Sequence, residues 1–258
     1  MAPKRCERAH RSHRPKAPCN PPPAHRRPCC RQRASRRNSQ EKGAVDAAAA
    51  PRPSVNGYLS SIVGGAGGVG TVLTQLACRL TGLTVIATAS REKSRDWCLQ
   101  MGAHHVLDHR RPLPQQVEAL EAPPVRYVAS LTHTAQHLAE LIEIIEPHGK
   151  IGVIDDHDSL DAAPLKAKSL SLHWEMVFTR PLYGTADLIG QHRILKEVAS
   201  LTDAGVLRST MTKCLSPFSA ENLEEGHRLV EGGAMVGKVV MSRGPSDVPQ
   251  ADQASVAP

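Results

Sequence analysis

The sequence predicts an α/β fold built on a doubly wound parallel sheet, and three observations support this prediction. From about residue 58, short apolar segments rich in β-branched residues alternate with segments of helical period. The strand-like segments are nearly continuous apolar runs, as expected for strands that are buried on both faces. The helical segments are roughly 10–15 residues long, the length of a βαβ crossover. Such crossovers are right-handed, so helices should cover both faces of the sheet.

The individual elements follow from local sequence signals. The β-branched run LTVIATAS predicts one strand, Gly102 should end the helix that follows it, and Pro147 and Gly149 should end a later helix. The expected elements are, in order, a strand ending at 63, helix 69–80, strand 83–90, helix 91–102, strand 104–108, strand 125–131, helix 134–149, strand 150–155, strand 170–178, helix 185–204, and a turn, helix and final strand within 214–242.

The positive charge lies almost entirely at the N-terminal end. Residues 1–53 hold 14 of the 32 lysines and arginines and only three acids, a net charge of about +11, whereas the remainder carries about −4. Large apolar residues are nearly absent there, so we expect residues 1–57 to be disordered. The mildly acidic body gives no reason to expect nucleic acid as a main partner. Two alternatives are a basic arm that tethers the protein to RNA or DNA, and a GC-rich stretch read in an unselected frame.

The cysteines and the hydropathy indicate a compartment and exclude some sites. The seven cysteines have no disulfide-framework spacing, which favours a reducing compartment, and Cys78, Cys98 and Cys214 are interpreted as buried or half-buried residues. The cysteines of the basic segment lack the C-x₂-C spacing of a zinc site. No apolar run reaches about 18 residues, so no membrane span is expected. Prolines in the basic segment argue against an amphipathic transit peptide, and we expect a cytoplasmic protein.

The stretch GGAGGVG (64–70) carries the clearest functional signal. Gly65-x-Gly67-x-x-Gly70 follows a strand and opens a helix, which is the context that a dinucleotide-binding fingerprint requires. The first glycine permits a tight turn, the second lets the backbone approach the pyrophosphate, and the third lets the helix pack on the strand. The helix N-terminus would hold the pyrophosphate. A flexible hinge is the alternative interpretation.

The end of the second strand favours NADP(H) over NAD(H). An NAD site usually has an acidic residue about 20 residues after the glycines, to bind the ribose hydroxyls. Here Ser90 and Arg91 follow the strand, and the first acid is Glu92. A small polar residue and a guanidinium suit a 2′-phosphate. The alternative is that Arg91 is simply the first exposed residue of a helix.

From these motifs, the chain resembles the medium-chain dehydrogenase/reductase superfamily over roughly residues 61–242. The similarity is greatest to the zinc-type alcohol dehydrogenase-like and quinone oxidoreductase branch. It is carried by GGAGGVG (64–70), TVIATASR (84–91), MGAHHVLDH (101–109), EPHGKIGVIDD (146–156), LSLHWE (170–175) and EGGAMVGKVV (231–240). The resemblance implies a Rossmann sheet of order 3-2-1-4-5-6 and NADPH-dependent reduction of a carbonyl, enone or quinone.

The resemblance also assigns expected roles to residues. It implies that the pyrophosphate is lined by Gly65, Gly67, Gly68, Val69 and Gly70. Ser90 and Arg91 would face the adenosine ribose phosphate. Thr132 and His133 would lie near the nicotinamide and are the catalytic candidates, with helix capping or surface exposure as the alternative for His133. Gly237 and Lys238 would belong to a returning C-terminal segment that closes over the cofactor. His173 and Trp174 are interpreted as strand packing or as a dimer-edge surface.

The chain also departs from the family pattern. In the family, a β-rich domain of about 120–150 residues, near the usual domain size, precedes the nucleotide domain and supplies most of the substrate pocket and the catalytic zinc ligands. Here the basic segment stands in that place, and Ser60-Ser61 interrupt the first strand. We therefore expect a truncation or fusion boundary near residue 61 and no zinc site.

Two functional hypotheses remain open at this stage. One is a zinc-independent NADPH oxidoreductase acting on a small molecule; the other is a truncated NADP(H)-binding module with little or no turnover. The expected organisation is a disordered segment 1–57, a nucleotide-binding domain 58–205, a remnant of the catalytic domain 206–242 and a loose tail 243–258. An apolar flank exposed by the missing domain would promote association, so a homodimer is an expected partner.

Overall fold

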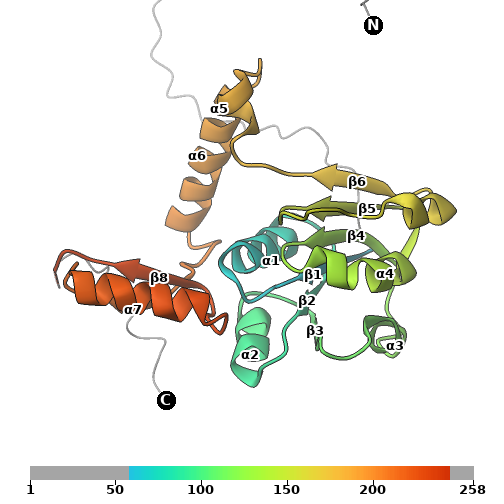
Figure 1. Cartoon of the computed structure of the whole chain (residues 1–258), viewed down its shortest axis with the longest axis horizontal. Helices are drawn as coiled ribbons and strands as arrows, with labels where there is room; N and C mark the ends of the chain where they lie inside the picture. The colour runs from blue at the N-terminus through green and yellow to red at the C-terminus, as the bar shows by residue number, and fades with distance from the viewer. Residues whose placement is uncertain (1–57, 245–258) are drawn as a thin grey trace, which may run out of the picture. The chain divides into compact units, whose positions relative to one another are not determined.

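A parallel six-stranded sheet forms the centre of the computed structural model, which describes residues 58–244. The strand order is β3-β2-β1-β4-β5-β6, which confirms the predicted doubly wound topology (Figure 1). The strands are β1 (Leu59–Val63), β2 (Thr84–Thr88), β3 (His105–Leu107), β4 (Val125–Ser130), β5 (Ile145–Val153) and β6 (Ser171–Trp174). The order reverses between β1 and β4, and in open α/β sheets the crevice at the carboxyl end of such a reversal is where ligands bind.

Helices connect these strands and cover both faces of the sheet. They are α1 (Gly68–Leu80), α2 (Glu92–Gln100), α3 (Leu113–Glu118) and α4 (Thr134–Ile144), and a 3₁₀ turn (Ala163–Lys168) precedes β6. Successive residues of a strand face opposite sides of a sheet. Accordingly, Ile86 belongs to a core cluster with Leu113 and Leu141 of α3 and α4, whereas Ala87 packs with Cys98 of α2.

The helix predicted over 134–149 ends earlier than expected, at Ile144. Ile145 is fully buried and pairs with Val125, so it belongs to β5 rather than to the helix. Continuing the helix to Pro147 would bring the proline ring against the carbonyl of Glu143. The predicted strand 150–155 therefore begins at residue 145, with a register shift between Val125 and Tyr127 that accommodates the proline.

The two serines of β1 do not prevent this strand from forming at the centre of the sheet. Ser60 is 7% exposed and Ser61 is 1% exposed, and both pair with β2 on one side and β4 on the other. The Ser61 hydroxyl is buried with no hydrogen-bond partner among the described atoms. Backbone pairing on both sides therefore outweighs a residue choice that is poor for a buried strand.

The C-terminal region adds helices and a second, smaller parallel sheet. It contains α5 (Thr179–Tyr183), α6 (Ile189–Asp203), β7 (Met211–Leu215), α7 (Ala220–Glu231) and β8 (Lys238–Met241), and β7 pairs with β8. The sequence did not predict α3, α5 or β7. The strand predicted over 170–178 ends at Trp174, because β5 ends at Val153 and the Glu175 N–H makes the last bond to that strand.

Backbone and side-chain bonds attach this region to the turn before α1 and to α1 itself. The Gly237 N–H donates to the Ala66 carbonyl at 2.9 Å, and the Gln75 amide bonds both backbone groups of Arg208. The predicted disordered segment 1–57 lies outside the described residues, and so does the predicted tail 243–258 except for its first two residues. Within residues 58–244, no helix is long and apolar enough to span a membrane.

Candidate functional site

The glycine turn between β1 and α1 is anchored to the end of β2. The Gly64 N–H donates to the Thr88 hydroxyl at 3.1 Å, and the Gly65 N–H donates to the Thr88 carbonyl at 3.3 Å. The left-handed residue of the turn is Gly64, with φ +80°, and not the first glycine of the fingerprint. Gly65 is needed for a different reason, since a Cβ there would lie 2.7 Å from the Ala87 Cβ.

The other two glycines of the fingerprint meet different surroundings. A Cβ on Gly70 would meet the Gly64 carbonyl oxygen and lie 2.7 Å from the Gly65 Cα, so this position packs α1 against the turn. A Cβ on Gly67 would lie 3.5 Å from the nearest atom, the Gly64 oxygen, which is an ordinary contact. Among the described residues, packing therefore does not require a glycine at position 67, whereas close approach of a pyrophosphate to the backbone would.

The N-terminus of α1 offers donors to a ligand. Gly67 is its N-cap and has no side chain to accept from the first turn, and the first intrahelical bond runs from Thr71 N–H to the Gly67 carbonyl at 2.9 Å. The N–H groups of Gly68, Val69 and Gly70 therefore have no acceptor within the helix. Val69 is exposed beside them. Such a terminus attracts anions through its free donors and its dipole.

Lys238 lies against this helix terminus. Its ammonium Nζ is 2.7 Å from the position that a Cβ on Gly68 would occupy, and its aliphatic stem is closer still. Gly237, with φ +66°, brings the chain here through its bond to Ala66. The structure thus brings the C-terminal pair Gly237-Lys238 to the glycine turn, adding a positive charge to its donors.

Ser90 and Arg91 lie between β2 and α2. Ser90 is half-buried, and Arg91 is exposed at the position before Glu92, the first residue of α2. The Arg91 Nη1 donates to the Gly233 carbonyl at 3.1 Å, so this side chain also reaches the C-terminal region. One hydrogen bond leaves most of the guanidinium donors available to a ligand.

Thr132 and His133 form the turn between β4 and α4. The Thr132 Cγ2 is 3.0 Å from the position of a Cβ on Gly64, so the turns after β1 and β4 meet where the strand order reverses. The Thr132 hydroxyl and the His133 Nδ1 lie 2.7 Å apart. His133 has φ +54° and stands at the N-cap of α4, but its side chain makes no capping hydrogen bond there.

Asp155 lies at the same carboxyl edge of the sheet as this turn, and it was not singled out from the sequence. It follows β5 and accepts from the Thr134 N–H at 3.0 Å and from the Thr134 hydroxyl. Burial works to raise the pKa of this carboxyl, but the two Thr134 donors prevail and lower it. His157 Nε2 lies 3.4 Å from the Asp155 Oδ1. Two acids at the end of the predicted strand 150–155, Asp155 and Asp156, were the signal that could have found this residue.

Histidines also gather near the end of β3. The rings of His109 and His137 lie edge to face with centroids 6.1 Å apart, and burial, followed by the charge of His137, lowers the pKa of His109. Over residues 58–244, no three His, Cys, Asp or Glu side chains are grouped as metal ligands would be. The buried thiol of Cys98, whose pKa is raised to about 11 by burial, is poorly suited to act as a nucleophile.

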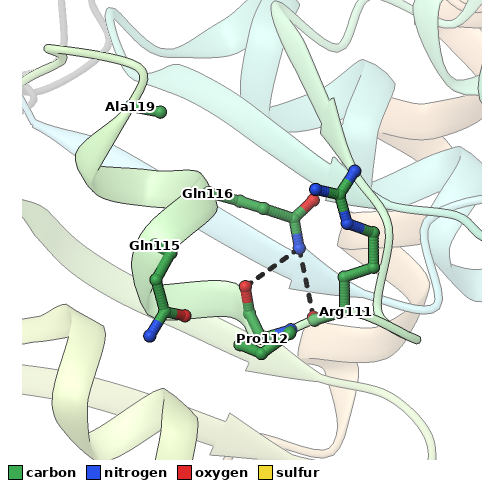
Figure 2. Close-up of a pocket in the computed structure, with 5 residues that line it drawn as sticks. All are labelled: Arg111, Pro112, Gln115, Gln116 and Ala119. Atoms are coloured by element: carbon green, nitrogen blue, oxygen red, sulfur yellow. Dashed lines mark hydrogen bonds between the residues drawn. The ribbon is translucent and has the colours of Figure 1, made fainter.

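A shallow cavity of about 240 Å³ lies beside α3 and is lined by Arg111, Pro112, Gln115, Gln116 and Ala119, which Figure 2 draws as sticks. The Gln116 amide donates to the carbonyls of Arg111 and Pro112, both at 3.1 Å. The polar groups that line the cavity therefore hold the loop before α3 in place. None of the predicted site residues lines this cavity.

Comparisons with known proteins agree with this geometry. A family described as zinc-binding dehydrogenases matches residues 101–241. A zinc-type alcohol dehydrogenase-like protein of Staphylococcus aureus (strain MSSA476) is 38% identical over 182 residues, which are 70% of this chain and 54% of that protein. The chain therefore spans about half the length of the curated relatives that it matches.

Solved structures show the same similarity. A Rhizobium etli CFN 42 protein described as a zinc-dependent alcohol dehydrogenase is 46% identical, with a TM-score of 0.70 over 75% of this chain and 56% of that one. The Escherichia coli quinone oxidoreductase solved with NADPH is 17% identical, with a TM-score of 0.58 over 72% of this chain and 57% of that one. The latter likeness is one of fold.

Proposed function

This chain belongs to the zinc-binding dehydrogenase family, and we propose that it is an oxidoreductase that binds NADP(H) and reduces a carbonyl, enone or quinone substrate. One observation carries the proposal: Lys238 and the Thr132-His133 turn both lie against the glycine turn, at the crevice expected where the strand order reverses. That crevice is where dinucleotides bind in open α/β sheets.

Each part of the crevice has a proposed task. The free N–H groups of α1 and the Lys238 ammonium attract the pyrophosphate. The Arg91 guanidinium receives the 2′-phosphate, with Ser90 beside it. The bound nicotinamide supplies the hydride. The Thr132 hydroxyl and His133 imidazole, in contact at 2.7 Å, polarise the substrate oxygen and hold the proton that it takes up.

Zinc has no part in this proposal. The family description implies the metal, but the described residues provide no group of three His, Cys, Asp or Glu side chains that would fit it. Hydride transfer needs chiefly a positioned nicotinamide and a substrate held over it, so the proposed reaction uses no metal ion.

The alternative is a module that binds NADP(H) with little or no turnover. It stays open because the chain spans about half the length of its curated relatives. Two measurements on the full chain separate these hypotheses. The first is NADPH binding, measured by fluorescence, and the second is NADPH consumption with a quinone and with an enone. We expect binding and consumption. Binding without consumption would support the module, and no binding would defeat both.

We also propose that the protein self-associates through the edge formed by β6. This strand is the last of the sheet, and its free edge can pair with a second copy. Large apolar side chains on it and just after it are exposed by half or more, namely Trp174, Met176, Val177 and Phe178. Such a run of exposed apolar residues marks an interaction surface.

Self-association predicts a dimer that Trp174→Glu disrupts. A charge on the exposed edge strand would be buried without a partner in the dimer. Sedimentation velocity should give the dimer mass for the parent and the monomer mass for Trp174→Glu, whereas Lys196→Glu on the exposed face of α6 should leave the dimer intact. A parent that sediments as a monomer at micromolar concentration contradicts this proposal.

A further inference from the structure

A chain of buried hydrogen bonds joins the ends of β4 and β5. The Ser130 and Thr134 hydroxyl oxygens lie 2.7 Å apart, and both residues are fully buried. The Thr134 hydroxyl donates to the Asp155 Oδ1, so its single proton is used and Ser130 must be the donor to Thr134. The chain therefore runs in one direction and ends on the Asp155 carboxylate.

Asp155 also supplies the cap that α4 lacks locally. His133, the N-cap residue, makes no side-chain capping bond, and the N–H of Thr134 donates instead to the Asp155 Oδ2 at 3.0 Å. A carboxylate at this end of a helix is favoured by the helix dipole. His133 is in the left-handed region, which a non-glycine residue adopts at a cost, so surrounding contacts must hold it.

His157 reinforces this carboxylate from the side of β6. Its side chain is 8% exposed, its Nε2 is 3.4 Å from the Asp155 Oδ1 without a hydrogen bond, and its ring lies 6.0 Å from that of Trp174. The charge of His157 contributes, after the Thr134 donors, to lowering the pKa of Asp155. Ser130 at the end of β4, Thr134 at the start of α4, and Asp155 and His157 after β5 thus form one polar cluster.

The cluster belongs to the second half of the sheet, at the ends of β4 and β5. In this topology β1 to β3 form one mononucleotide-binding half and β4 to β6 form the other. Arg91 and the glycine turn belong to the first half, which the adenosine phosphates would occupy. The turn with Thr132 and His133 belongs to the second, and Asp155 holds the residue that follows it.

We propose that Asp155 is a positioning residue for the nicotinamide half of the cofactor, acting through Thr134 on the turn that carries Thr132 and His133. The inference rests on the proposed function, because it takes the dinucleotide to bind in this crevice. Asp155 has no contact of its own with the cofactor in this scheme. Asp155 fixes the position of the turn, and the turn contacts the nicotinamide.

The test compares two ligands on the full chain, NADPH and adenosine 2′,5′-bisphosphate, which lacks the nicotinamide half. Asp155→Asn keeps the size of the side chain but has one acceptor oxygen, so its amide faces one of the two Thr134 donors. Losing one charge-assisted bond should raise the Kd for NADPH about tenfold. The Kd for the bisphosphate should stay within about twofold, because its site lies on β1 and β2.

Thr134 gives a second, milder pair of variants. Thr134→Val removes the hydroxyl and keeps the backbone donor. It should weaken the binding of NADPH but not that of the bisphosphate. Thr134→Ser restores the hydroxyl and should bind both ligands like the parent. This rescue and the selective loss are readouts that a general loss of stability would not produce.

The outcomes separate this inference from the proposed function. A parent that binds neither ligand overturns both. A parent that binds both ligands, with Asp155→Asn and Thr134→Val unchanged toward NADPH, overturns the positioning role alone. So does an equal loss of both ligands in either variant that folds. If Asp155→Asn does not fold, the Thr134 pair decides by the same comparison.

Discussion

Replacing Gly70 with alanine is expected to lower the free energy of unfolding by about 3 kcal/mol or more and to abolish NADPH binding. The added Cβ would meet the Gly64 carbonyl oxygen and lie 2.7 Å from the Gly65 Cα. Both obstacles are backbone atoms of the turn itself, so neither can rotate away. Helix α1 would have to separate from the turn, and its free N–H groups would move with it.

Gly67→Ala is the matched variant, and we expect the opposite combination. The new Cβ would lie 3.5 Å from the Gly64 oxygen, an ordinary contact, and Gly67 has φ −71°, which alanine readily adopts. Stability should therefore stay within about 1 kcal/mol of the parent. The methyl group would, however, occupy the space in front of α1 through which the pyrophosphate approaches, and NADPH binding should weaken more than about tenfold.

Urea denaturation and NADPH fluorescence titration on both variants check this pair. A Gly70→Ala protein as stable as the parent would show that α1 does not depend on close packing at this position. A Gly67→Ala protein that binds NADPH as well as the parent would show that the ligand does not approach here. The two variants thus separate a role in packing from a role in binding, which the motif alone cannot do.

The sheet was predictable because its signals are local. Continuous apolar runs with β-branched residues, separated by helical segments, indicate a buried parallel sheet whatever the details of its contacts. The glycine spacing likewise predicted a turn between β1 and α1. The left-handed residue of the turn, Gly64, was not predicted, since it lies before the fingerprint. Conformation within a glycine run depends on its contacts with Thr88 and α1, which no pattern contains.

Element ends were harder to predict because tertiary contacts decide them. Pro147 and Gly149 predict a helix that runs to residue 149, but burial of Ile145 against β4 ends α4 at Ile144. The strand after Ser169 stops at Trp174 because its neighbour β5 has ended. Both differences arise from pairing with a strand that is distant in sequence.

The candidate site combines residues that the sequence keeps far apart. Lys238 lies on the glycine turn although 170 residues separate it from Gly68. That pairing could be expected from family resemblance but not from composition or spacing. Asp155 was overlooked because an acid after a strand is common, and its partner Thr134 becomes visible only when β4 and β5 are placed side by side.

The second large effect is expected at Arg91, because this residue is proposed to select NADPH over NADH. Arg91→Ala should raise the Kd for NADPH by about 10- to 100-fold, the range expected when charge-assisted hydrogen bonds to a phosphate are lost. The Kd for NADH should change by less than about twofold, because NADH lacks the 2′-phosphate. Titration of the full chain with the two cofactors measures both effects.

Lys93→Ala serves as the control for charge alone, because Lys93 is also exposed and stands two residues further along, in α2. It should weaken NADPH far less than Arg91→Ala does. Arg91→Lys should recover only part of the affinity, since an ammonium lacks the planar fork that binds a phosphate through paired donors. If Arg91→Ala weakens NADH as much as NADPH, Arg91 supports the crevice through its bond to Gly233 rather than selecting the 2′-phosphate.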